Sequence, residues 1–306
     1  MPLHLLLSLL VILSAAKNPR ICFSGRSEAT YKYTSSETHM KILILSPHRG
    51  DAAFSLSWAI TNWLAAGHTV TILTIFTRSL HAPFSDAEFV HENDRMSYVS
   101  AMRLREDELF AQRLTQSLPK SAKTNLQIVD LNLKDAPIRL RCPIEDLFDR
   151  PADPNDPAIE KIRKALTRQS EAGAMEAIVV PLALGEHVDH LTVRAAALPL
   201  TPTLPSAFYE DLPYAATHPS AATDLYQLRE ELTTQLNEPL TPVLCQTPSA
   251  DELKHRLLAL YASQLDDDMA AQIVDFGHRY QGGERLWANQ EWLKMGQILV
   301  SSPQTI

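Results

Sequence analysis

From residue 40 onward, segments with the composition of buried strands alternate with segments whose apolar spacing predicts helices. The run KILILS at 41–46 is apolar almost throughout, which is typical of a strand buried on both faces of a parallel sheet. Further strands are expected at 68–77, 125–132, 177–182 and 206–210, and helices at 52–67, 93–117 and 158–172. Alternation of this kind builds βαβ units. The sequence therefore predicts an α/β fold of Rossmann-like type, with a mainly parallel sheet and helices on both faces.

Residues 40–306 are expected to form one domain, because they contain no internal repeat, low-complexity tract or linker. Several prolines between 133 and 157 predict a long surface loop there, since proline interrupts both helices and sheets. Beyond residue 220 the pattern is more helical and less regular.

Residues 1–39 are expected to lie outside this domain. The apolar run at 3–16 is too short to cross a bilayer comfortably, so stable membrane insertion is not expected. Two interpretations remain open: a leader that is cleaved or disordered, or an upstream extension of a protein that begins at Met40. No Lys or Arg precedes the apolar run, which favours the extension and a cytoplasmic location. The alternative is export, if residues 1–16 act as a signal peptide.

The charge balance narrows the classes of partner. Lys and Arg number 28 against 36 Asp and Glu, and the net charge of −8 argues against a nucleic-acid binder that grips phosphates. The three cysteines are far apart and form no CxxC pair, so neither a disulfide framework nor a thiolate zinc site is expected. Any metal ion must be held by histidines and carboxylates. A homo-oligomer is left open.

Two polar loops follow predicted strands at the edge where parallel sheets bind their ligands. His48 and Asp51 follow the first strand, and His187 and His190 follow the strand at 177–182. Two histidines and a carboxylate are a common ligand set for catalytic zinc. The alternative is structural, with Asp51 as a helix N-cap and the histidines as solvated loop residues. Two such clusters after two parallel strands favour the metal.

These loops resemble those of the PIG-L, or LmbE-like, family of zinc-dependent N-deacetylases. The family's His-Pro-Asp-Asp motif corresponds to 48–51, and its later His-x-x-His motif corresponds to 187–190. Other stretches that look familial lie at 73–77, 103–107, 209–214, 261–264 and 283–285, so the resemblance covers nearly all of 41–290. It implies hydrolysis of an acetamide on a small N-acetylated sugar conjugate of the N-acetylglucosamine type.

The resemblance also implies roles for individual residues. His48, Asp51 and His190 match the family's ligands for Zn²⁺, or for another divalent metal. His187 matches the catalytic histidine that stabilises the tetrahedral intermediate or protonates the leaving amine, and Asp189 matches the acid that supports this histidine.

One position departs from the family. Its general base is the first Asp of the motif, and Gly50 stands at that position here. General-base catalysis contributes roughly 10²–10⁴ in rate, so activity is expected to be low unless another group serves. The groups considered as substitutes are His187, Glu186, Glu210 and Asp211. A weakened or inactive relative that binds a metal and a sugar-type ligand is therefore the alternative function, and a metal-free scaffold is the third.

Two arginines are candidates for substrate contact. Arg78 follows the second strand and could bind an anionic or sugar group, against the alternative of a surface salt bridge. Arg103 lies in the familial stretch 103–107, against the alternative of an ordinary helical pair with Glu106.

Overall fold

The computed structural model describes residues 39–295, apart from 86, 117, 121, 124, 149, 218–220 and 247–249. The segment expected at 1–39 lies outside the described residues, except for His39. Within these residues, no helix combines the length and the apolar character that crossing a membrane requires.

A seven-stranded sheet forms the centre of the fold, in the order β3-β2-β1-β4-β5-β7-β6. The strands are β1 (Lys41–Ser46), β2 (Thr69–Thr74), β3 (Leu126–Asp130), β4 (Ala177–Pro181), β5 (Ser206–Tyr209), β6 (Thr241–Gln246) and β7 (Gly283–Ala288). The first five pair in parallel, and β7 pairs antiparallel with both β5 and β6. This mainly parallel sheet confirms the predicted α/β fold. Chain order reverses between β1 and β4, and that is where such sheets place their sites.

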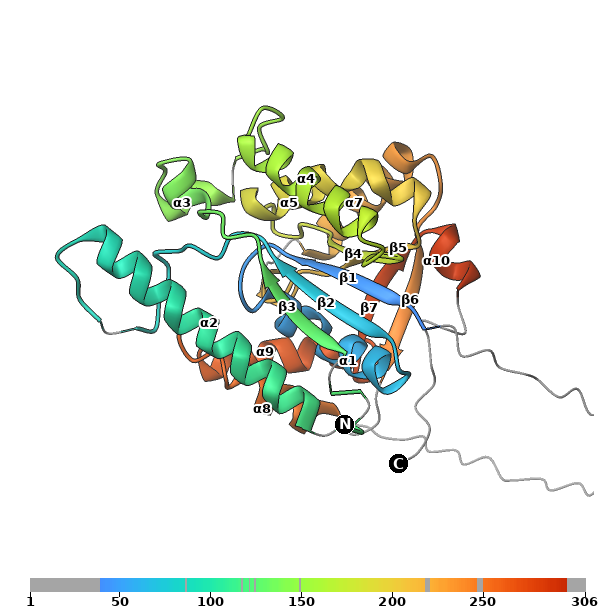
Figure 1. The fold of residues 1–306 in the computed structure, drawn as a ribbon, viewed down its shortest axis with the longest axis horizontal. Helices are drawn as coiled ribbons and strands as arrows, with labels where there is room; N and C mark the ends of the chain where they lie inside the picture. Colours follow the sequence, from blue (N-terminus) through green and yellow to red (C-terminus); the bar gives the residue numbers. More distant parts are fainter. Residues whose placement is uncertain are drawn as a thin grey trace, which may run out of the picture. The chain divides into compact units, whose positions relative to one another are not determined.

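Helices cover both faces of the sheet (Figure 1). One face carries α4 (Pro157–Glu171), α5 (Val188–Ala197) and α7 (Ala221–Leu236), and the other carries α1 (Asp51–Ala65), α2 (Glu92–Gln116), α8 (Ala250–Leu258) and α9 (Asp267–His278). The shorter helices are α3 (Ala136–Arg139), α6 (Tyr214–Thr217), α10 (Gln290–Lys294) and two 3₁₀ turns, η1 (Ile144–Leu147) and η2 (Leu198–Thr203).

Two expectations about the path of the chain need correction. The stretch 133–157 is not loop throughout, because α3 and η1 form within it, with proline at the start of each. The strands β6 and β7 were not recognised in the sequence. β6 carries Pro242 and alternates between exposed and buried residues at the sheet edge, and β7 contains two charged residues, so neither resembles the apolar runs of the centre.

Helix α1 is buried along most of its length and is kinked at Leu56, where φ is −134°. The kink leaves backbone N–H groups of the second half without helical partners, and the Glu284 carboxylate of β7 accepts hydrogen bonds from the N–H groups of Trp58 (3.1 Å) and Ala59 (2.9 Å). Lys254 of α8 pairs with this carboxylate, and both side chains are buried. The C-terminal part of the chain thus holds the helix that follows the first polar loop.

Candidate functional site

The loop between β1 and α1 is folded by its own polar groups. The Ser46 hydroxyl donates to the carbonyl of His48 (2.7 Å) and accepts from the N–H of Ala52 (3.1 Å). The N–H of His48 donates to Asp51 Oδ2 at 2.7 Å. Gly50, not Asp51, occupies the N-cap position of α1, and no side chain caps it. The Asp51 carboxylate therefore faces back into the loop and does not serve as the N-cap.

His48, Asp51 and His190 converge at the carboxyl ends of β1 and β4. Their ligand atoms all lie within 4.8 Å of one another. His48 Nδ1 is 3.3 Å from Asp51 Oδ2, and His190 Nε2 is 3.2 Å from the same oxygen. All three residues are buried. The structure thus brings together the three residues that the resemblance assigns to a metal.

Outer carboxylates fix the orientation of both imidazole rings. Asp189 Oδ2 lies 2.9 Å from His48 Nε2, and Asp211 Oδ1 lies 2.6 Å from His190 Nδ1. A neutral ring that donates to its outer carboxylate turns its other nitrogen, as a lone pair, toward Asp51. His190 Nε2 is buried and makes no hydrogen bond within the described part of the chain. Two lone pairs and a carboxylate that face one another fit a divalent cation.

The carboxylates around His190 also change its pKa. Burial lowers the pKa of His190, but the carboxylates of Asp51 and Asp211 outweigh it and raise that pKa to about 10. The cluster therefore attracts positive charge strongly, whether as protons or as a metal ion.

His187 lies beside the cluster, with its ring centroid 5.0 Å from that of His48. Its Nδ1 accepts the backbone N–H of Asp189 at 3.1 Å, which leaves Nε2 as the protonated nitrogen of a neutral ring. Burial and the charge of His48 lower the pKa of His187 to about 3. His187 is therefore held as a neutral hydrogen-bond donor.

The resemblance implies that Asp189 supports His187, but the hydrogen bonds of its carboxylate go to other residues. It contacts His48 Nε2, receives Arg139 Nη1 at 2.7 Å and accepts the N–H of Ala136 at 2.9 Å. Its hydrogen bond with the His187 ring runs through the backbone N–H, and the charge of its carboxylate acts to raise the pKa of His187. Asp189 thus orients His48, a position for which the spacing of the motif gave no signal.

A cavity of about 370 Å³ opens over these residues. Its polar lining includes His48, Asp51, His187, Arg103 and Asp135, and its apolar wall includes Phe84, Phe148 and Tyr214. Asp135 was not singled out in the sequence, although it follows β3 at the same edge of the sheet. Its side chain is buried, and Oδ1 has no hydrogen-bond partner among the described residues. Burial raises the pKa of this carboxyl above its ordinary value, although Ser79 hydrogen-bonds to it.

The two arginines expected to contact the substrate line different cavities in the structure. Arg103 lines the cavity, where its Nη2 donates to the carbonyl of Arg49 (3.0 Å) and to Gln264. Glu106 does not pair with it, and instead accepts hydrogen bonds from Ser263 and Gln264. Arg78 lies outside this cavity and lines another one.

No model of a known protein family matches the chain. The chain is 31% identical over 259 residues to 2'-N-acetylparomamine deacetylase of Streptomyces fradiae, a match that covers 81% of each protein. The chain belongs to the LmbE-like, or PIG-L-like, family of deacetylases.

Solved structures of LmbE-like deacetylases share the fold. The zinc-inhibited form of teicoplanin deacetylase matches with a TM-score of 0.55 at 19% identity, covering 81% of this chain and 97% of that one. The N,N'-diacetylchitobiose deacetylase of Pyrococcus horikoshii matches with a TM-score of 0.51 at 16% identity, covering 84% and 86%.

Gly50 stands in this LmbE-like chain where the resemblance places an acid, and its backbone conformation is one that suits glycine. Its φ is +99°, in a region that residues with a side chain rarely adopt. A Cβ built here would lie 2.5 Å from the Phe54 ring, which packs edge-on against Tyr261. The neighbouring Arg49 is buried and pairs with Asp107 (3.1 Å) and Asp130, so it anchors the loop to α2 and β3. Any side chain at position 50 would therefore strain the backbone and displace the Phe54 ring.

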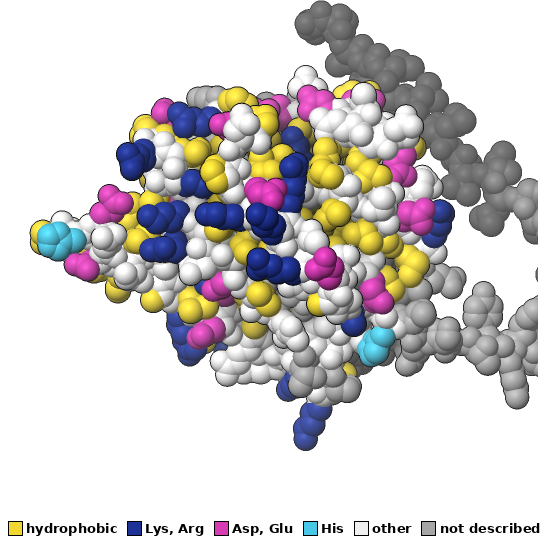
Figure 2. Space-filling model, turned by 45° about the horizontal axis from the view of Figure 1, so that its top comes forward, with side chains coloured by type: hydrophobic (Ala, Val, Ile, Leu, Met, Phe, Trp, Pro, Cys, Tyr) yellow, Lys and Arg dark blue, Asp and Glu magenta, His cyan; other side chains and the backbone are white. Residues whose placement is uncertain are grey.

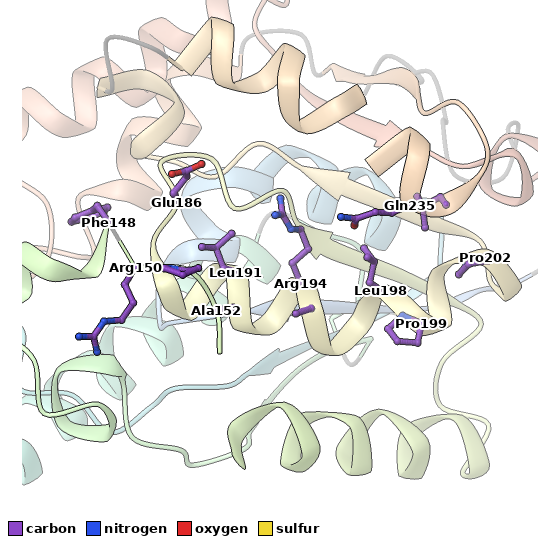
Figure 3. Close-up of a pocket in the computed structure, with 13 residues that line it drawn as sticks. Phe148, Arg150, Ala152, Glu186, Leu191, Arg194, Leu198, Pro199, Pro202 and Gln235 are labelled. Carbon is purple, nitrogen blue, oxygen red and sulfur yellow. The ribbon is translucent and has the colours of Figure 1, made fainter. Parts of the chain in front are cut away.

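The four groups considered as substitutes for the missing base all have other placements in this LmbE-like chain. His187 presents an N–H to the cavity, and Asp211 is bonded to His190. Glu210 accepts from Tyr280, Arg285 and Trp287, away from the cavity. Glu186 is exposed and lines a groove of about 850 Å³ along α5, together with Leu191 and Arg194 (Figure 3). Among carboxylates of the described residues, Asp51 and Asp135 line the cavity.

Proposed function

We propose that this chain is a metal-dependent N-deacetylase, with zinc or another divalent ion held by His48, Asp51 and His190, that hydrolyses the acetamide of a small N-acetylated amino-sugar conjugate. The observation that carries the proposal is the buried cluster itself, in which His190 Nε2 faces Asp51 without a hydrogen bond. A divalent ion bound there lowers the pKa of water and polarises the acetyl carbonyl.

We assign Asp135 the proton transfer that Gly50 cannot perform. Its free Oδ1 accepts a proton from water as the water oxygen adds to the carbonyl carbon. The same proton then passes to the nitrogen as the C–N bond breaks, so that acetate and the free amine leave. A carboxyl with a raised pKa suits both steps, because it holds the proton long enough to return it.

His187 serves the other side of the reacting carbonyl. Because its ring is neutral and Nδ1 is occupied, Nε2–H donates a hydrogen bond to the oxygen on which negative charge develops. Arg103 and the aromatic wall of Phe148 and Tyr214 contact the sugar, since aromatic faces pack well against the C–H surfaces of a sugar ring. The substrate class follows the relative that acts on 2'-N-acetylparomamine.

Metal content tests the ligand assignment. Purified protein should contain close to one equivalent of zinc or a similar ion, and His48→Ala and His190→Ala should each lose it. His278→Ala is the matched control, because His278 is an exposed histidine of α9 that contacts Asp251. Equal metal content in all four proteins would refute the assignment.

Acetate release from N-acetylglucosamine and from 2'-N-acetylparomamine tests the activity. Gly50 favours a second candidate, a silent relative that binds both the metal and the sugar. Calorimetric binding of either sugar without acetate release, at full metal content, would favour that binder and refute the enzyme.

A further inference from the structure

A second cavity of about 450 Å³ lies beside α3 and the N-terminal end of α4. It shares no lining residue with the catalytic cavity. We call it the basic pocket, because its cationic side chains come from three separate segments: Arg78 after β2, Lys134 before α3 and Arg139 at its end, and Lys161 on α4. The face of the molecule that carries α3 and α4 shows a band of Lys and Arg side chains (Figure 2). This band lies on a chain whose net charge is −8.

The backbone places two of these cations side by side. The N–H of Arg78 donates to the carbonyl of Leu133, and the N–H of Asp135 donates to the carbonyl of Arg78, both at 3.0 Å. This parallel bridge pairs Arg78 with Lys134. Like charges at paired positions destabilise a sheet unless a counter-charge lies between them.

Neither of the two acidic residues that line the basic pocket forms an ion pair with Arg78, Lys134 or Lys161. Asp156 is bound to Arg139 Nε at 2.9 Å and also caps α4 through the N–H of Ala158 at 2.8 Å. Asp153 is exposed and accepts the N–H of Asn155. Across the described residues, Arg78, Lys134 and Lys161 form no ion pair, whereas Arg139 forms two. Three of the four cations therefore lack an ion-pair partner among the described residues, and the four cations outnumber the two carboxylates that line the hollow.

We propose that the basic pocket binds a phosphate group, either as inorganic phosphate or as the phosphate monoester of a small molecule. A guanidinium and two ammonium groups match the charge and the acceptor oxygens of a phosphate dianion. The volume exceeds that of one phosphate, which leaves room for the rest of a small ester.

Calorimetric titration of the full chain with inorganic phosphate, at constant ionic strength set with chloride, tests the site. The test variant is Arg78→Ala/Lys161→Ala. Its matched control is Arg105→Ala/Lys164→Ala, which removes the same charge from two exposed side chains outside the basic pocket. Arg139 is kept, because its guanidinium also holds Asp189. We expect phosphate to bind the wild type and the control alike, and the test variant about tenfold or more weakly.

Equal affinities in the wild type and the test variant would overturn the proposal, as would an equal loss in the control. Any phosphate held in the catalytic cavity persists in the test variant, so only the component lost with Arg78 and Lys161 counts. Titration with glucosamine 6-phosphate distinguishes the two sources. Tighter binding than inorganic phosphate, again lost in the test variant, assigns the basic pocket to a phosphate monoester; weaker binding assigns it to the free anion.

Discussion

Replacing Gly50 is the most direct test of how the first loop is built. In Gly50→Ala the new Cβ would lie 2.5 Å from the Phe54 ring, and the alanine would have to adopt a φ of +99°. The left-handed backbone costs about 1–2 kcal/mol, and overpacking of a buried site typically costs about 1–3 kcal/mol more. The expected loss is therefore about 2–5 kcal/mol of unfolding free energy, or a fall in melting temperature of roughly 5–15 °C. Gly50→Asp, which restores the family's residue, should lose at least as much and should not gain activity.

Gly173 provides a matched control at the end of α4. Its φ is +60°, and nothing lies within 4 Å of a Cβ built there, so Gly173→Ala incurs the backbone cost without the clash. Urea denaturation of both variants measures the difference between them, which contains the clash with Phe54 and the extra backbone cost of φ +99° over φ +60°. Equal destabilisation of Gly50→Ala and Gly173→Ala would refute the packing argument. A Gly50→Asp variant that is stable and faster than wild type would show that the family's base can be restored.

Two further predictions concern buried carboxylates. Asp135→Asn should lower acetate release by about 10²–10⁴ while metal content stays unchanged, since amide nitrogen and oxygen cannot take up the proton. Because the base must be deprotonated, wild-type activity should rise with pH through a pKa above the ordinary aspartate value, and a pH profile without that limb would contradict the role. Lys254→Met leaves Glu284 buried without its counter-charge and should cost about 3–5 kcal/mol in urea denaturation. Adding Glu284→Gln should recover most of that loss, and a double variant no more stable than Lys254→Met would contradict the ion-pair account.

The parallel half of the sheet could be predicted because its strands are apolar runs. β1, β2 and β4 are buried along nearly their whole length, so their composition differs clearly from that of the helices. The same logic located the two polar loops, since parallel strands bring their carboxyl ends to one edge. β6 and β7 could not be found in this way. β6 contains Pro242, which is unusual in a strand. β7 contains the charged Glu284, which is buried because Lys254 of another element pairs with it. A pattern-based prediction therefore misses both strands.

In the site, too, contacts between residues close in sequence could be predicted, and contacts between distant residues could not. Spacing could group His48 with Asp51 and His187 with His190, because each pair spans a single junction between a loop and a helix. It could not assign Asp189 to His48, a contact across 141 positions. It could not separate Arg78 from the cavity either, because the side of α3 on which a residue lies depends on how the chain folds after β3. Asp135 could have been found by applying the strand-end rule to the third strand as well.

The tie between α1 and β7 has a consequence for how the protein is made. Asp51 stands at the start of α1, while the carboxylate that completes the kinked middle of this helix is Glu284, 226 positions after Trp58. During synthesis the early strands can leave the ribosome long before that carboxylate exists, so α1 cannot be fully bonded until the chain has been made as far as residue 284. A nascent chain stalled before residue 284 should therefore expose the Trp58 amide to solvent exchange. Full protection, and with it a rigid cluster of His48, Asp51 and His190, would arrive only after Glu284 has been made and has packed against α1.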